Sequence, residues 1–143
     1  MTSQRITERE YCTPKPKIEE RPLLDPDLSL SLEATFQALG NANRLRLLHS
    51  LIREPDTSVG DLADAVGMSV TAISNHLRRL TDRGIVRPKR NGKQVHYRIV
   101  DPCIVSILDH GLCLTEELLR GSGASAPPEE MVQKVETLFR DSV

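Results

Sequence analysis

The chain of 143 residues has no tryptophan, two phenylalanines, two tyrosines and three cysteines. Proteins that bind single-stranded nucleic acid stack bases on aromatic side chains, so this shortage argues against that class. Three cysteines are too few for the disulfide framework of a small secreted domain, which favours a reducing, cytoplasmic setting. No apolar run approaches the ~20 residues that span a membrane, and the first ten residues lack the apolar core of a secretory signal. We therefore expect a globular protein without a membrane segment.

The sequence also lacks the catalytic signatures that can be recognised without a structure. It has no glycine-rich phosphate loop, no nucleophile elbow and no His-Glu-x-x-His zinc motif. We therefore expect a protein that binds its partner and is not an enzyme.

The net charge of −1 conceals a strong segregation along the chain. Residues 69–98 contain eight Lys or Arg and one acidic residue, which gives +7. Residues 99–143 contain three basic and eight acidic residues, which gives −5. The basic block favours binding to nucleic acid, although a solvated surface can have the same composition.

The spacing of apolar residues and prolines divides the chain into three parts. Residues 1–27 contain four of the nine prolines and few apolar residues, which predicts a partly disordered N-terminal arm. Residues 28–121 are expected to form one mainly α-helical domain, in which a helix from about 43 to 53 buries Leu45, Leu48 and Ile52. Residues 122–143 are expected to form a linker and a C-terminal helix.

Within the domain, two short helical segments are joined by a tight turn. Residues 58–67 predict a helix that ends at a glycine, and Ser69 can cap a second helix running from 70 to about 83. The second helix has an apolar stripe at Val70, Ile73, Leu77 and Leu80. Such a pair of helices is a helix-turn-helix. The β-rich runs 85–89 and 95–100 flank an Asn-Gly pair and predict a hairpin directly behind it, which would make the fold winged.

Four segments resemble the ArsR/SmtB family of bacterial winged-helix repressors: 38–48 (ALGNANRLRLL), 59–63 (VGDLA), 73–80 (ISNHLRRL) and 90–97 (RNGKQVHY). The resemblance as a whole extends over roughly residues 30–118, with Ala42 standing where the family commonly has proline. The resemblance implies a homodimer that binds operator DNA and releases it when an inducer, usually a metal ion, binds.

The predicted DNA-binding residues lie on the second helix of the motif and on the hairpin. Hydroxyl and amide side chains near a helix N-terminus can contact base edges and phosphates, and cationic side chains can contact phosphates or guanine. The candidates are Ser69, Thr71, Ser74, Asn75, His76, Arg78, Arg79, Lys89, Arg90 and Lys93. We expect their partner to be a double-stranded operator with an inverted repeat.

The candidate inducer site lies on the helix that Asp101-Pro102 begins. The family pattern Asp-x-His…His-x-x-Glu falls here on Asp101, Cys103, Leu114 and Glu117, so one histidine is replaced by cysteine and one is lost. At 100° per residue, Cys103, His110, Cys113 and Glu117 share one face about 80° wide. Two thiols, an imidazole and a carboxylate suit zinc, cadmium or another thiophilic metal. The predicted ligands are therefore Asp101, Cys103, His110, Cys113 and Glu117.

Other interpretations remain open. The arm cysteine Cys12 could join Asp61 in the family's other metal site, but Ser58 replaces the cysteine that site requires. A thiol-based sensor of oxidants, reactive sulfur species or electrophiles is another possibility. Cys103 and Cys113 lie about 15 Å apart along one helix, so a disulfide would need two chains or Cys12. A winged helix could also serve as a protein-interaction module without binding DNA.

Overall fold

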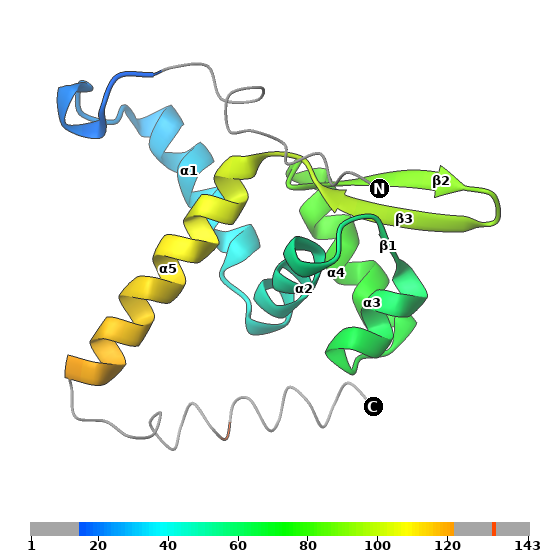
Figure 1. Cartoon of the computed structure of the whole chain (residues 1–143). Helices are drawn as coiled ribbons and strands as arrows, with labels where there is room; N and C mark the ends of the chain where they lie inside the picture. The colour runs from blue at the N-terminus through cyan, green and yellow to red at the C-terminus, as the bar shows by residue number, and fades with distance from the viewer. Residues whose placement is uncertain (1–14, 122–132, 134–143) are drawn as a thin grey trace, which may run out of the picture.

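The computed structural model describes residues 15–121 and residue 133, so the predicted C-terminal helix and Cys12 lie outside the described part. The described chain forms a winged helix-turn-helix, in which α5 runs along one side and the hairpin β2–β3 projects from the opposite side (Figure 1). The elements in order are η1 (Ile18–Glu20), α1 (Pro26–Leu39), α2 (Ala42–Arg53), β1 (Thr57–Ser58), α3 (Val59–Val66), α4 (Val70–Asp82), β2 (Val86–Asn91), β3 (Gln94–Ile99) and α5 (Pro102–Gly121).

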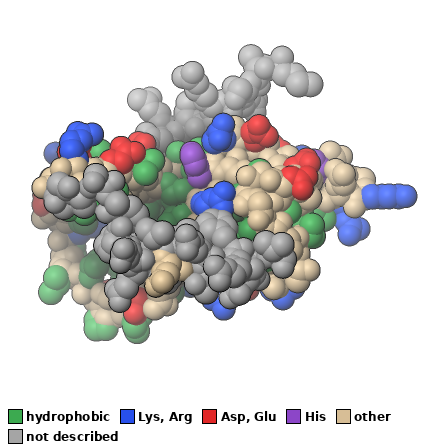
Figure 2. Space-filling view, turned by 90° about the horizontal axis from the view of Figure 1, so that it is seen from below, with side chains coloured by type: hydrophobic (Ala, Val, Ile, Leu, Met, Phe, Trp, Pro, Cys, Tyr) green, Lys and Arg blue, Asp and Glu red, His purple; other side chains and the backbone are tan. Residues whose placement is uncertain are grey.

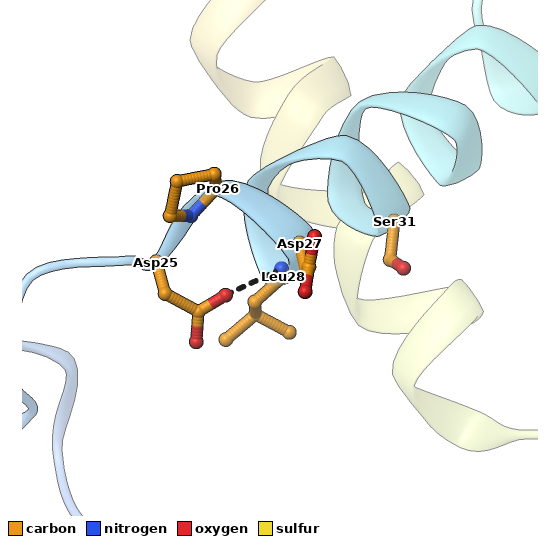
Figure 3. Close-up of a pocket in the computed structure, with 5 residues that line it drawn as sticks. All are labelled: Asp25, Pro26, Asp27, Leu28 and Ser31. Carbon is orange, nitrogen blue, oxygen red and sulfur yellow. Dashed lines mark hydrogen bonds between the residues drawn. The ribbon is translucent and has the colours of Figure 1, made fainter.

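Helix α1 begins at Pro26, two residues before the predicted boundary between arm and domain. The Asp25 carboxylate accepts a hydrogen bond of 2.8 Å from the backbone N–H of Leu28, and proline occupies the first helical position. Figure 3 shows this cap within a surface pocket lined by the start of α1. Because the carboxylate already satisfies the free end of the helix, we assign this pocket no ligand.

The prediction of the buried face of α2 was partly wrong. Leu48 is fully buried as expected, but Leu45 is 41% exposed and Ile52 is half-buried. Leu47 and Leu51 take their places in the core. Both sets follow helical spacing, and packing against α3 and α4 selects the one that is buried.

The helix-turn-helix forms where it was predicted. Ser58 Oγ accepts from the backbone N–H of Asp61 at 3.2 Å and caps α3, and Gly67 ends that helix with a left-handed φ of 69°. Ser69 Oγ accepts from the backbone N–H of Ala72 at 3.2 Å and caps α4. Ile73, Leu77 and Leu80 are fully buried beneath α4. The first residue of the predicted stripe, Val70, is 55% exposed because the first turn of α4 extends past the core.

The wing is part of a three-stranded antiparallel sheet with the order β1-β3-β2. The hairpin was predicted from the sequence, but β1 was not, because two residues are too few to show the alternation of apolar and polar side chains typical of a strand. Asn91 pairs with Gln94, so the turn consists of Gly92 and Lys93, one residue later than the Asn-Gly pair suggested. Gly92 has a φ of 64°, which explains the glycine at this position.

None of the helices in the described part of the chain combines the length and apolar character needed to cross a membrane.

Candidate nucleic-acid interface and inducer site

The outer face of α4 is exposed along its length. Thr71, Asn75 and Arg78 are all exposed and lie on the side opposite the buried stripe. Ser69 is also exposed, and Ser74 is half-buried at the edge of this face. The capped N-terminus and the fully buried inner face fix the position of α4, so these side chains form a preorganised polar surface.

The structure separates two predicted residues from this outer face. His76 is half-buried on the flank of α4, and burial lowers its pKa below the ordinary value of 6.5, with further lowering by the charges of Arg44 and Arg79. Burial and then the charge of Arg79 also lower the pKa of Arg44. The α4 residues His76 and Arg79 therefore lie near the α2 residue Arg44, and His76 remains neutral near neutral pH.

Arg44 was not singled out by sequence analysis, although it holds α1 against α2. Its side chain is 7% exposed. Its Nε donates to the carbonyl of Ala38, and its Nη2 donates to the carbonyl of Gln37 at 3.0 Å. These carbonyls belong to the last turn of α1, where a cation is stabilised by the negative end of the helix dipole.

The wing presents cations on both of its faces. Lys89 pairs with His96 and Arg87 pairs with Arg98, which places these four side chains on the face turned away from the core residues Val86 and Ile99. Arg90 lies on the other face, and Lys93 lies in the turn. Arg87 and Arg98 belong to the basic block of residues 69–98 but were not among the predicted DNA-binding residues; the strand register identifies them.

The Arg87–Arg98 pair is unfavourable within the chain alone. Like charges directly opposite on neighbouring strands destabilise a sheet. Among the described residues, neither arginine has an ion pair or side-chain hydrogen bond. The pair leaves two exposed guanidinium groups without an ion pair among the described residues, which suits an anionic partner.

A hydrogen bond ties the base of the wing to the loop before β1. His96 Nδ1 donates to the carbonyl of Asp56 at 2.7 Å. Asp56 has a left-handed φ of 57°, which is uncommon for a residue other than glycine. This hydrogen bond and the pairing of β1 with β3 tie the wing to the segment that leads into α3.

The predicted metal ligands are spread along α5. The Asp101 carboxylate accepts from the backbone N–H of Cys103 at 2.8 Å, which is a cap interaction at the start of the helix. His110 Nδ1 donates to the carbonyl of Ser106 at 2.8 Å, which leaves Nε2 facing outward. Glu117 forms an exposed ion pair of 2.9 Å with Arg120.

The two α5 cysteines differ in state. Cys113 is exposed and free, whereas Cys103 is half-buried and disulfide-bonded. A disulfide sulfur cannot act as a thiolate ligand, so metal binding requires the reduced form of Cys103.

The described part of one chain does not bring three of these ligands together. Cys103 and His110 are seven residues apart on one helix, or about 10 Å along its axis. These two donors of one helix are therefore too far apart to bind the same ion. Ser58 is 7% exposed and caps α3, so it contributes no ligand to the other family site.

Apolar side chains on α1 and α5 are exposed in the single chain. In α5 only Ile104 is buried, and in α1 only Ala38 and Leu39 are. In Figure 2, Lys and Arg side chains project from the wing. Hydrophobic side chains are visible at the opposite end of the molecule. The large exposed apolar residues of these two helices are Leu28, Leu30, Leu32, Phe36, Val105, Ile107, Leu112, Leu114, Leu118 and Leu119.

Comparison with known proteins agrees with this geometry. Residues 41–87 match the family model described as winged helix-turn-helix DNA-binding. The chain is 34% identical over 89 residues to the cadmium resistance transcriptional regulatory protein CadC of Listeria innocua serovar 6a, covering 62% of this chain and 75% of the relative.

Two solved structures are similar as well. The crystal structure of the AntR antimony-specific transcriptional repressor is 47% identical and has a TM-score of 0.65, covering 76% of this chain and 98% of that one. A solution structure of a homodimeric winged helix-turn-helix domain from Mycobacterium bovis, a possible ArsR-family regulator, is 26% identical with a TM-score of 0.58. That match covers 68% of this chain and 91% of the other.

Proposed function

The chain belongs to the ArsR/SmtB family of winged-helix transcriptional regulators, and from this premise we propose that it is a metal-responsive repressor. It binds operator DNA as a homodimer and releases the operator when a thiophilic or borderline metal ion binds between the two α5 helices. The observation that carries the DNA-binding part is the exposed outer face of α4 beside a wing whose cations have no acidic partner in the described chain.

The contacts with DNA divide by chemistry. Thr71, Ser74 and Asn75 on α4 contact base edges in the major groove, and Arg78 contacts guanine or phosphate; the exposure of Thr71, Asn75 and Arg78 supports this assignment. On the wing, Lys89, Arg90 and Lys93 meet the phosphate backbone. Ser69 supports this set by capping α4, and His76 and Arg79 approach the DNA from the flank that faces Arg44.

The homodimer is supported by the exposed apolar face of α1 and α5. Leu114 is 60% exposed and Leu118 is 64% exposed in the single chain. Large exposed apolar residues on a helix are typical of an interaction surface, and α1 and α5 both have them. The Mycobacterium bovis relative is described as homodimeric. Because a two-fold dimer presents two identical recognition helices, the operator is an inverted repeat with half-sites about one helical turn apart.

The proposed inducer site uses donors from both chains. Asp101 and Cys103 of one α5 combine with His110 and either Cys113 or Glu117 of the other, which gives thiolate, imidazole and carboxylate ligands. This donor set fits zinc or cadmium. The names of two relatives, a cadmium resistance regulator and an antimony-specific repressor, point to the same class of soft ion. When bound, the metal would fix the two α5 helices relative to each other.

A thiol-based sensor is the second candidate, and the disulfide of Cys103 favours it. Oxidation and metal binding compete for the same sulfur, since only the thiolate coordinates a metal. Under this alternative, an oxidant or a reactive sulfur species releases the operator without any metal.

An operator-release titration tests the proposal. An inverted repeat is first selected from random duplex DNA with the reduced, metal-free protein, and release is then followed by fluorescence anisotropy. Zinc, cadmium, copper(I), lead, arsenic(III), antimony(III) and peroxide are added separately. We expect release by at least one metal and loss of that response in Cys103→Ser, with operator affinity retained. Release by peroxide alone would favour the thiol sensor, and absence of salt-sensitive DNA binding would refute the repressor.

A further inference from the structure

Arg83 belongs to the basic block, yet its side chain is engaged away from the proposed DNA-binding face. It is the residue that ends α4, and its backbone N–H donates to Arg79 and Thr81 carbonyls. Its Nη2 donates to the carbonyl of Ser31 and to Thr35 Oγ1, both at 3.1 Å. Both acceptors lie on α1, about 50 residues earlier in the chain.

The acceptor pair is itself ordered. Thr35 Oγ1 donates to the carbonyl of Ser31 at 3.1 Å, so the hydroxyl is oriented by its own helix and can accept from Arg83. Thr35 is half-buried, whereas Ser31 is exposed. The guanidinium, the hydroxyl and the carbonyl thus form one bridge between the end of α4 and the middle of α1.

Among the described residues, this bridge is one of few contacts to the middle of α1. Of the residues of α1, only Ala38 and Leu39 in the last turn are buried. Arg44 binds carbonyls in the same last turn, whereas Arg83 binds two residues that lie one to two turns earlier. Two fixed points along a helix define its direction, so the Arg44 contact with α2 and the Arg83 contact with the end of α4 together set the direction of α1 relative to these two helices.

From this geometry we infer that Arg83 is a positioning residue that sets the separation of the two recognition helices in the dimer. The inference rests on the proposed homodimer, in which α1 packs against the partner. If α1 is held by the partner, any change in the α1–α4 angle moves each α4 relative to the two-fold axis. Arg83 therefore acts on the spacing of the operator half-sites and not through a phosphate contact.

The place of Arg83 along α4 agrees with this role. Recognition helices contact base edges with their N-terminal residues. Arg83 lies 14 residues beyond the cap Ser69, or about 20 Å along the helix axis. Arg78, on the outer face nearer the N-terminus of α4, is the arginine proposed to meet guanine or phosphate, and it has no ion pair in the described chain.

The test compares two duplexes, the selected inverted repeat and an isolated half-site, at several salt concentrations. For Arg83→Gln we expect binding to the inverted repeat to weaken about fivefold, as for loss of a hydrogen bond worth about 1 kcal/mol. Half-site affinity and the salt dependence are expected to stay unchanged. Relaxed discrimination between operators whose spacers differ by one base pair is expected as well.

Two variants separate positioning from charge and from misfolding. Thr35→Val removes an acceptor without changing any charge, and it is expected to weaken the inverted repeat in the same direction, with a non-additive effect in the double variant. Arg83→Lys keeps one donor and is expected to restore part of the affinity. Arg53→Gln removes an exposed charge from the end of α2 and serves as the matched control.

Equal weakening of both duplexes by Arg83→Gln, with a salt slope reduced by about one unit, would identify a phosphate contact and overturn the inference. Unchanged binding to both duplexes in Arg83→Gln would also overturn it. Either result with normal wild-type binding leaves the proposed function intact. A wild-type protein that binds no duplex DNA would overturn the proposed function, and this inference with it.

Discussion

Helices α4 and α5 are both amphipathic, but the single chain covers only one of them. In α4, Ile73, Leu77 and Leu80 are fully buried beneath α2, α3 and the wing. In α5, Ile104 is buried, while Leu112 is 56% exposed and Leu118 is 64% exposed. The helix-turn-helix half is therefore packed within one chain, whereas large apolar residues of α1 and α5 stay exposed there, as the proposed homodimer requires.

The largest expected effect comes from placing a charge in the α5 face. Leu114→Glu would bury two unpaired carboxylates per dimer, one from each chain, at a cost of roughly 3–5 kcal/mol. We expect sedimentation equilibrium at micromolar concentration to show mostly monomer. Circular dichroism should still show a folded chain, because Leu114 is 60% exposed in the single chain. A variant that stays fully dimeric would contradict the assignment of the α5 apolar face to the dimer interface.

Shortening a buried side chain of α4 should reduce the stability of the folded chain. Leu77 is fully buried, so Leu77→Ala should lower the free energy of unfolding by about 2–5 kcal/mol in urea denaturation. Leu112→Ala is the matched control at an exposed leucine. Its effect should depend on protein concentration, since it acts through the dimer, whereas the effect of Leu77→Ala should be present at every concentration.

The next effect concerns charge on the DNA-facing surface. Arg78→Ala and Lys93→Ala should each weaken operator binding and reduce the slope of log affinity against log salt by about one unit per lost phosphate contact. Arg53→Ala, on the exposed end of α2, should leave that slope unchanged. Parallel salt plots for the wild type and both test variants would remove Arg78 and Lys93 from the interface.

The smallest expected effect is a pH dependence at His76. Burial, Arg44 and Arg79 lower its pKa from 6.5, so the unfolded chain takes up this proton first as the pH falls. The contribution to stability is therefore present above about pH 6.5 and declines as the pH falls toward the lowered value. Urea denaturation at pH 7.5 and 5.5 should show a smaller decline in His76→Gln than in the wild type. An identical decline would contradict the placement of His76 beside two arginines.

The local signals of the sequence were sufficient for the helix-turn-helix and the wing. The serines that cap α3 and α4, the glycine after α3 and the change from helical to alternating spacing each have one strong interpretation. The start of α1 at Pro26 was missed, although Asp25-Pro26 is the same signal that predicted the start of α5 at Asp101-Pro102.

Tertiary choices could not be predicted in the same way. The apolar residues of α2 allow two overlapping stripes, and only the packing partners decide that Leu47 and Leu51 are buried instead of Leu45 and Ile52. Composition also cannot separate arginines that face DNA from arginines that bind backbone carbonyls. Arg83 and Arg44 are of the second kind, and contacts between residues distant in sequence reveal this.

The predicted metal ligands depend on a second chain and stay a prediction. Within the described residues, the donors of one α5 helix do not converge on a common point. The sequence could place them on one face of the helix, but the distance between faces of two copies is not encoded in any local pattern.

The most direct measurement of the central claim is the stoichiometry and salt dependence of binding to the selected inverted repeat, for wild type and Leu114→Glu side by side. The account predicts two wild-type chains per duplex and an affinity that falls steeply with salt. It also predicts much weaker binding by Leu114→Glu to the inverted repeat, with the same affinity as wild type for an isolated half-site. Binding of one chain per duplex, with equal affinity in both proteins, would contradict it.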